Sequence, residues 1–264
     1  MHKDHIQLSV EQIPEMVFLP GDPERVDEIS RYLSNVQHLG NNREYRTVSG
    51  EIDGTSVGVC STGMGGPSTE IAVVELFEKG ARRFIRIGTS GALQPHIEVG
   101  DLIIATGCIR ESGTARSYVP DTYPAVANYE MVLALIQACE ELKYPYHVGL
   151  GLSVDCFYAT KPELFGDRIP SQISPMLSEY VKAGALQMEM EAATVMVLAQ
   201  ILGASAAAIC TVGSNQITKE PSKSAPTNER AIQAACRGAQ ILSQWDRLRR
   251  EQGAANFYPI IQKG

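Results

Sequence analysis

The segment Phe84-Ile85-Arg86-Ile87-Gly88-Thr89-Ser90-Gly91 decides how this chain is expected to fold. Its apolar beginning, within residues 83–87, predicts a buried β-strand, and the Gly-Thr-Ser-Gly stretch predicts a break after that strand. The strand contains Arg86, and burying a guanidinium without a partner costs several kcal/mol. Arg86 therefore needs an anionic partner, which is either a carboxylate in a structural ion pair or a bound ligand.

Other short apolar runs, each typical of a buried strand, occur along the chain and alternate with longer helical patterns. The predicted strands cover residues 16–20, 56–60, 83–87, 102–105, 147–152 and 206–212. The predicted helices cover residues 69–79, 129–142, about 192–202 and about 227–251. This alternation is typical of a three-layer α/β/α fold with a central mixed, largely parallel sheet. We expect a single domain over residues 1–264, with a loosely ordered tail at about 252–264.

The composition narrows the class of function. The chain has 264 residues, of which 44% are hydrophobic and 20% are charged, and its net charge is −7. This charge disfavours a general attraction to nucleic acid or to an anionic membrane. No charged-then-apolar leader and no run of about 18 apolar residues occurs, so we expect a soluble, cytoplasmic protein. The six cysteines lack the spacing of a metal site and are expected to be reduced thiols.

Two further arginines are candidates for binding a small anion. Arg25 follows the turn Gly21-Asp22-Pro23, and Arg43 lies in Asn41-Asn42-Arg43-Glu44-Tyr45. Taken singly, each is typical of a solvated surface charge. The Gly-Thr-Ser-Gly stretch offers hydroxyl and backbone N–H groups, as many phosphate sites do, but it is also an ordinary turn. It has the spacing of neither a Walker loop nor a dinucleotide-binding motif.

Two carboxylates and an aromatic ring are candidates for holding an organic substrate. Glu189 and Glu191 precede a predicted helix, where they either favour the helix dipole or accept hydrogen bonds from a vicinal diol such as that of ribose. Phe157 follows a predicted strand and either packs in the core or stacks on a flat base. His5, in the amino-terminal arm, is by itself typical of a solvated histidine.

Five motifs occur together and in a fixed order. They are Gly21-Asp22-Pro23-x-Arg25, Arg43-Glu44-Tyr45, Ser61-Thr62-Gly63-Met64-Gly65-Gly66-Pro67-Ser68, Arg86-Ile87-Gly88-Thr89-Ser90-Gly91 and Glu189-Met190-Glu191. This set resembles the motifs of nucleoside phosphorylase family I, over a similarity that extends from His5 to about Arg247. The chain looks closest to bacterial uridine phosphorylases, through Gly66-Pro67-Ser68 and Gln94-Pro95-His96-Ile97.

The resemblance implies a role for each motif residue. The implied phosphate ligands are Gly21, Arg25, Arg43, Arg86 and Thr89. The implied ribose ligands are Met190 and Glu191, with Glu189 nearby and His5 reaching across a dimer interface from a neighbouring subunit. The implied base contacts are Ser90, Phe157, Val212 and Gly213. Arg86, Glu191 and His5 form the implied catalytic set. Glu44, Met64 and Ser68 correspond to positions that hold a monovalent cation such as K⁺ at the dimer interface of some relatives.

The base pocket departs from the family pattern. Uridine phosphorylases carry a Gln-x-Arg pair where this chain has Lys161-Pro162-Glu163, so the cationic contact to the base falls to Lys161 or to Arg168. Purine-specific relatives carry an aspartate that protonates the purine, and here Ser214 stands at that place. A serine cannot act as this acid, so uridine is favoured, but the nucleobase stays open.

The resemblance implies a pentosyltransferase of nucleotide salvage, assembled as a dimer or hexamer. It would cleave the N-glycosidic bond of a nucleoside with inorganic phosphate, giving the free base and ribose 1-phosphate, without an organic cofactor. One alternative is a purine nucleoside phosphorylase. A second is a hydrolytic nucleosidase, which uses water and has no need of three arginines. A third is a nucleoside-binding protein that lacks activity.

Overall fold

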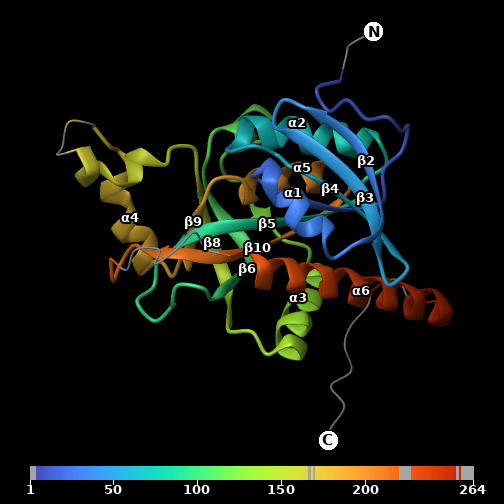
Figure 1. Ribbon diagram of the computed structural model, residues 1–264. Coiled ribbons are helices and arrows are strands. Elements are labelled where there is room, and N and C mark those ends of the chain that lie inside the picture. Colours follow the sequence, from blue (N-terminus) through green and yellow to red (C-terminus); the bar gives the residue numbers. More distant parts are fainter. Residues whose placement is uncertain (1–3, 166–167, 169, 220–226, 254–255, 257–264) are drawn as a thin grey trace, which may run out of the picture.

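One mixed sheet runs through the molecule, with helices on both of its faces (Figure 1). The computed structural model describes residues 4–165, 168, 170–219, 227–253 and 256. The strands are β1 (Met16–Pro20), β2 (Ser34–Asn42), β3 (Tyr45–Ile52), β4 (Thr55–Cys60), β5 (Arg83–Ala92), β6 (Leu102–Glu111), β7 (Ala125–Val126), β8 (Tyr146–Val154), β9 (Gln187–Glu189) and β10 (Ser205–Asn215). The helices are α1 (Pro23–Ser30), α2 (Gly66–Glu78), α3 (Tyr129–Leu142), α4 (Ile173–Lys182), α5 (Ala192–Ile201) and α6 (Glu229–Gln252).

The sheet combines a parallel centre with antiparallel edges. Its strand order is β10-β6-β8-β9-β5-β1-β4-β3-β2, and β10 also pairs with β5, so five strands close into a small ring. β4, β1, β5 and β10 are parallel neighbours, whereas β2, β3 and β4 form antiparallel hairpins. Helices α2 and α5 pack together on one face, and α3 and α6 pack together on the other (Figure 1). The predicted α/β class with a mixed, layered sheet is confirmed.

β5 is longer than the sequence predicted. The expected break at residues 88–91 is wrong, because this stretch continues the parallel pairing with β10 and the register shifts only after Val212. Gly88 permits the close packing, since a Cβ there would lie 2.9 Å from both Cys210 Sγ and Arg86 Nη2. The hydroxyl-rich stretch is therefore held rigidly as part of the sheet.

Several elements were not predicted, namely β2, β3, β7, β9, α1 and α4. The turn at Gly21-Asp22-Pro23 is the beginning of α1. Asp22 caps this helix by accepting a hydrogen bond from the backbone N–H of Glu24 at 2.9 Å, and Pro23 occupies its first turn. Both features were visible in the sequence, but α1 has only 8 residues, too few to show a clear helical period.

Three remaining predictions concern the carboxyl-terminal tail, the cysteines and membrane-spanning segments. α6 ends at Gln252, and the predicted loose tail lies outside the described residues apart from Gln252, Gly253 and Asn256. The six cysteines are unpaired, and all but Cys156 are buried. Among the described helices, none has the length and apolar character that crossing a membrane requires.

Candidate active site

A cavity of about 1100 Å³ opens beyond the carboxyl ends of β1, β4, β5 and β8, where ligands bind in open α/β sheets. All five sequence motifs contribute to its walls. The contributing residues are Gly21, Asp22, Pro23, Arg25, Glu44, Gly63, Met64, Ser68, Arg86, Thr89, Ser90, Gly91, Glu189, Met190 and Glu191. The fold therefore brings together five segments that are widely separated in the sequence.

Arg86 is held between two carboxylates in the cavity wall. Its Nε donates to Glu189 Oε2 at 2.8 Å, and its Nη2 forms an ion pair with Glu191 Oε2. All three side chains are buried. The structural ion pair that the sequence left open is thus present, and Arg86 also lines the cavity, where it can contact a ligand.

The two carboxylates differ in how many hydrogen bonds they already accept. Glu189 Oε2 also accepts from the backbone N–H groups of Glu191 and Ala192, each at 2.8 Å, and its Oε1 accepts from Ser153. Glu191 Oε1 accepts from the backbone N–H of Gly65 at 2.5 Å, which leaves this carboxylate further acceptor capacity. Glu191 is therefore the one suited to bind substrate hydroxyls, and Glu189 holds its neighbours in place.

The charges in this cluster depend on one another. Burial alone would lower the pKa of Arg86, but Glu191 and Glu189 outweigh it and raise that pKa, so Arg86 stays charged. Burial raises the pKa of Glu191, and the attraction of Arg86 opposes this only in part. One guanidinium facing two carboxylates leaves the cluster short of positive charge, so a phosphate would need a second cation.

Arg25 supplies that second cation. Its Nη1 donates to the carbonyl oxygen of Ile87 at 3.3 Å, and its Nη2 lies 3.5 Å from Thr89 Oγ1. Among the described residues it has no ion pair, and both burial and the nearby Arg86 lower its pKa. Asn228 bridges the two residues when its amide oxygen faces Arg25 and its amide nitrogen faces Thr89. In this orientation the oxygen accepts from Arg25 Nε at 3.0 Å and the nitrogen donates to Thr89 Oγ1. A bound anion would relieve the repulsion between the two arginines.

The other end of the cavity has the features of a base pocket. Phe157 is 51% exposed, and Lys161 Nζ lies 4.1 Å from the centre of its ring. The buried hydroxyl of Ser90 has no hydrogen-bond partner in the described part of the chain, although Ser90 lines the cavity. Gln216 Nε2 donates to Ser214 Oγ at 3.1 Å, and both residues line the cavity with Gly213. This end offers a stacking surface, a cation and neutral hydrogen-bonding groups.

Four residues that the sequence assigned to the site do not line this cavity. His5 binds a carboxylate of α2, with Nδ1 2.7 Å from the oxygen. Arg43 is exposed in the turn between β2 and β3, with a φ of 55°. Val212 is fully buried. Arg168 is exposed, and its Nε donates to a backbone carbonyl at 3.0 Å.

The residues implied in monovalent cation binding lie together on the cavity wall. Ser68 Oγ donates to the carbonyl oxygen of Met64 at 3.2 Å. A Cβ at Gly63 would meet Glu44 Cγ at 2.9 Å and Ser68 Oγ at 3.1 Å, so these side chains flank Gly63. The three residues therefore share one side of the cavity, around a glycine whose φ of 71° disfavours other residues.

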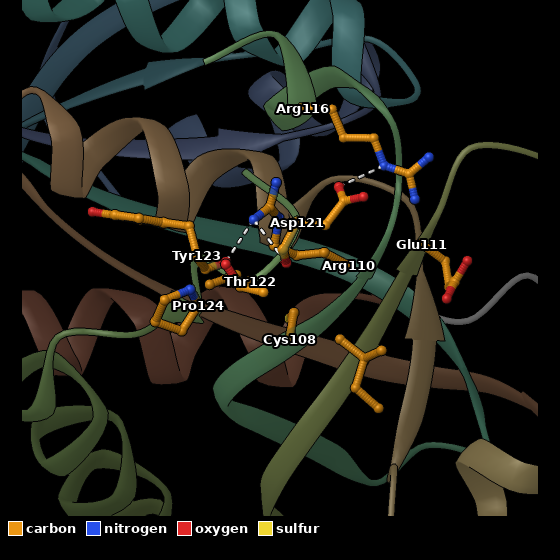
Figure 2. A pocket seen from close by; sticks show the side chains of 10 residues that line it. Cys108, Arg110, Glu111, Arg116, Asp121, Thr122, Tyr123 and Pro124 are labelled. Carbon is orange, nitrogen blue, oxygen red and sulfur yellow. Dashed lines mark hydrogen bonds and ion pairs between the residues drawn. The ribbon is translucent and has the colours of Figure 1, made fainter. Parts of the chain in front are cut away.

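A second cavity, of about 350 Å³, lies outside the five motifs (Figure 2). There Arg110 Nη1 donates to the carbonyl oxygens of Pro120 and Tyr123, at 2.9 and 2.5 Å, and Arg116 pairs with Asp121 at 2.9 Å. Arg110 thus anchors the loop that these residues belong to. Two arginines and two carboxylates line the cavity, so their formal charges cancel, and it suits a dianion less well than the larger cavity.

The residues near the site that the sequence did not identify include three polar ones, Asn228, Gln216 and Ser153. Gln216 could have been suspected, because it lies only two residues beyond Ser214, the position that the sequence compared with the purine-protonating aspartate. Asn228 and Ser153 are single polar residues in ordinary surroundings. Only the folded chain places them beside Arg25 and Glu189.

The geometry is supported by comparison with known proteins. Residues 15–245 match the family model described as "Phosphorylase superfamily". The uridine phosphorylase of Thermococcus kodakarensis is 42% identical over 257 residues, covering 97% of this chain and 92% of that protein. The uridine phosphorylase of Escherichia coli is 38% identical, covering 78% of this chain and 82% of that protein. A guanosine phosphorylase of Halorubrum lacusprofundi is 40% identical, covering 81% of this chain and 83% of that protein.

Proposed function

The chain belongs to the phosphorylase superfamily, and we propose that it is a nucleoside phosphorylase with uridine as its favoured substrate. The observation that carries the proposal is the position of Arg25, which has no ion pair in the described part of the chain, beside the Arg86–Glu191 pair in one cavity. An anion-binding group next to a diol-binding carboxylate is what phosphorolysis of a nucleoside requires.

In the proposed reaction, phosphate attacks the anomeric carbon while the base departs. Arg25, Arg86 and Thr89 would hold the phosphate, and Glu191 would accept hydrogen bonds from the ribose hydroxyls. Holding both reactants in place supplies the entropic part of the rate increase. The ribose gains oxocarbenium character, and the anionic Glu191 beside it favours that positive charge.

The departing base carries negative charge that the far end of the cavity would stabilise. Phe157 would stack on the base, and Lys161 and Ser90 would donate to its carbonyl oxygens. Uridine is supported by the relatives named uridine phosphorylase and by Ser214, which cannot protonate a purine. The relative named guanosine phosphorylase supports the alternative, a purine nucleoside.

The assembly belongs to the same proposal. We expect a homo-oligomer, either a dimer or a hexamer built from dimers, in the cytoplasm and in nucleotide salvage. His5 and Arg43 do not line the cavity of their own chain, so in the dimer they would complete the cavity of the neighbour. Glu44, Met64 and Ser68 would hold K⁺ at the interface. The co-substrate is inorganic phosphate, and neither nucleic acid nor membrane is expected as a partner.

The test is base release from uridine, thymidine, inosine and adenosine, each with and without phosphate. We expect uracil release from uridine that depends on phosphate and yields ribose 1-phosphate. Phosphate-dependent release of purine bases alone would support a nucleoside phosphorylase but show that its substrate is a purine nucleoside. Equal rates without phosphate would show a nucleosidase, and nucleoside binding without turnover would show a binding protein.

Lys161 and Arg168 give a matched pair of variants for the base pocket. Lys161→Met is expected to lower kcat for uridine about 10-fold, because a donor to the leaving base is lost. Arg168→Met removes a positive charge nearby, but outside the cavity, and is expected to leave kcat unchanged. Steady-state kinetics at saturating phosphate compare the two. The reverse order of effects would assign the cationic role to Arg168.

A further inference from the structure

Ser153 lies behind the cavity wall, at the end of β8. It is fully buried and does not line the cavity, so it does not touch the substrate directly. Its register partner on β9 is Glu189, and its hydroxyl donates to Glu189 Oε1. The same hydroxyl oxygen accepts from the backbone N–H of Ala193 at 2.9 Å, in the first turn of α5.

Glu189 links Ser153 to the groups that would bind substrate. Its Oε2 accepts from Arg86 Nε and from the backbone N–H of Glu191. Its Oε1 has Ser153 as its only hydrogen-bond donor in the described part of the chain. A buried carboxylate oxygen that loses its only donor bears the full cost of desolvation. Removing this hydroxyl would therefore weaken the support of both Arg86 and Glu191.

We propose that Ser153 is a positioning residue for phosphorolysis, which acts by fixing the Glu189 carboxylate that aligns Arg86 and Glu191. This inference rests on the proposed function. Without the serine hydroxyl, Glu189 Oε1 is buried without a donor, so the carboxylate is fixed less firmly against Arg86. Arg86 and Glu191 then lose their orientation toward phosphate and ribose, so the loss falls mainly on kcat.

In the part of the chain that the structure describes, four charged or titratable groups face this carboxylate. They are Arg86 on β5, Glu191 after β9, Cys108 on β6 and Cys210 on β10. Burial raises the pKa of Cys210 to about 12 and the pKa of Cys108 well above its ordinary value, so both thiols are neutral at working pH. The ionisation that Ser153 influences is therefore that of Glu191, because burial raises the pKa of this carboxyl and the attraction of a well-aligned Arg86 is the largest effect that opposes the rise.

The test compares Ser153→Ala with Ser112→Ala. Ser112 is an equally buried serine whose hydroxyl has no partner among the described residues, so its variant removes the same atom without removing a hydrogen bond. Ser153→Ala is expected to lower kcat at saturating substrates by about 10-fold or more and to move the acidic limb of the kcat profile to higher pH. Ser112→Ala is expected to change neither.

Two further measurements keep the outcome interpretable. Ser153→Cys retains a weak donor and is expected to fall between wild type and Ser153→Ala. Phosphate binding, measured by calorimetry without nucleoside, is expected to weaken in Ser153→Ala, and this readout does not depend on turnover. A lower Tm with unchanged kcat, pH profile and phosphate affinity would overturn the proposal. If the wild-type protein shows no phosphorolysis, the proposed function is refuted. The comparison of phosphate binding between wild type and Ser153→Ala then still decides the role of Ser153.

Discussion

Arg86→Met is expected to abolish measurable phosphorolysis and to lower the free energy of unfolding by about 3–5 kcal/mol. Arg86 is the only cation paired with Glu189 and Glu191 in the described part of the chain, and all three side chains are buried. Methionine fills similar space but leaves two buried carboxylates without a counter-charge. The same change removes a phosphate ligand and the group that orients Glu191.

Activity and stability are measured separately in this variant. Urea unfolding can be followed through the single tryptophan, Trp245, which is buried on α6. Arg25→Met is the control, because Arg25 has no ion pair among the described residues and is repelled by Arg86. It is expected to raise the KM for phosphate while leaving the unfolding free energy nearly unchanged. An Arg86→Met protein with wild-type activity would exclude Arg86 from the phosphate site.

Adding Glu189→Gln to Arg86→Met separates the two roles of the arginine. The double variant has one buried charge fewer than Arg86→Met alone, so part of the lost stability is expected to return. Phosphorolysis is expected to stay absent, because neither change restores a cation for phosphate. Recovery of activity together with stability would show that Arg86 only stabilises the fold.

The sequence predicted the parts of this protein that depend on local pattern. Alternating apolar runs and helical periods gave the α/β class, and helix α3 begins and ends at the residues predicted for it, Tyr129 and Leu142. The guanidinium within an apolar strand indicated that Arg86 needs a negative partner. The sequence could not choose between a carboxylate and a ligand, and in the structure Arg86 pairs with carboxylates and lines the cavity as well.

Other parts depend on contacts between distant segments and could not be predicted. The Gly88–Gly91 stretch has the composition of a turn, but pairing with β10 makes it a strand. Asn228 reaches Arg25 across some 200 residues of sequence, and Ser153 reaches Glu189 across 36. Likewise, proximity in sequence to the base loop favoured Arg168 as much as Lys161, whereas only Lys161 lines the cavity.

Glu191→Gln is expected to lower kcat by about 10²- to 10³-fold, with little change in stability. Glutamine keeps the size of the side chain and can still accept from the backbone N–H of Gly65. It loses the negative charge that favours the oxocarbenium character of the ribose. Because Glu189 still pairs with Arg86, the buried arginine keeps a counter-charge. Glu111→Gln is the control. The Glu111 carboxylate accepts from Tyr180 outside this cavity, so this variant is expected to keep wild-type kcat.

The pH dependence of the wild-type enzyme gives an independent test of Glu191. Burial raises the pKa of this carboxyl above the ordinary 4.5, and the neighbouring Glu189 adds to the rise while Arg86 opposes it. A raised pKa means that Glu191 gains its proton at a higher pH during acidification. If the ionised form is the active one, kcat at saturating phosphate falls as the pH drops, with an apparent pKa above 4.5. The residual activity of Glu191→Gln is expected to lack this limb, whereas an unchanged limb would assign the ionisation to another group, such as the bound phosphate.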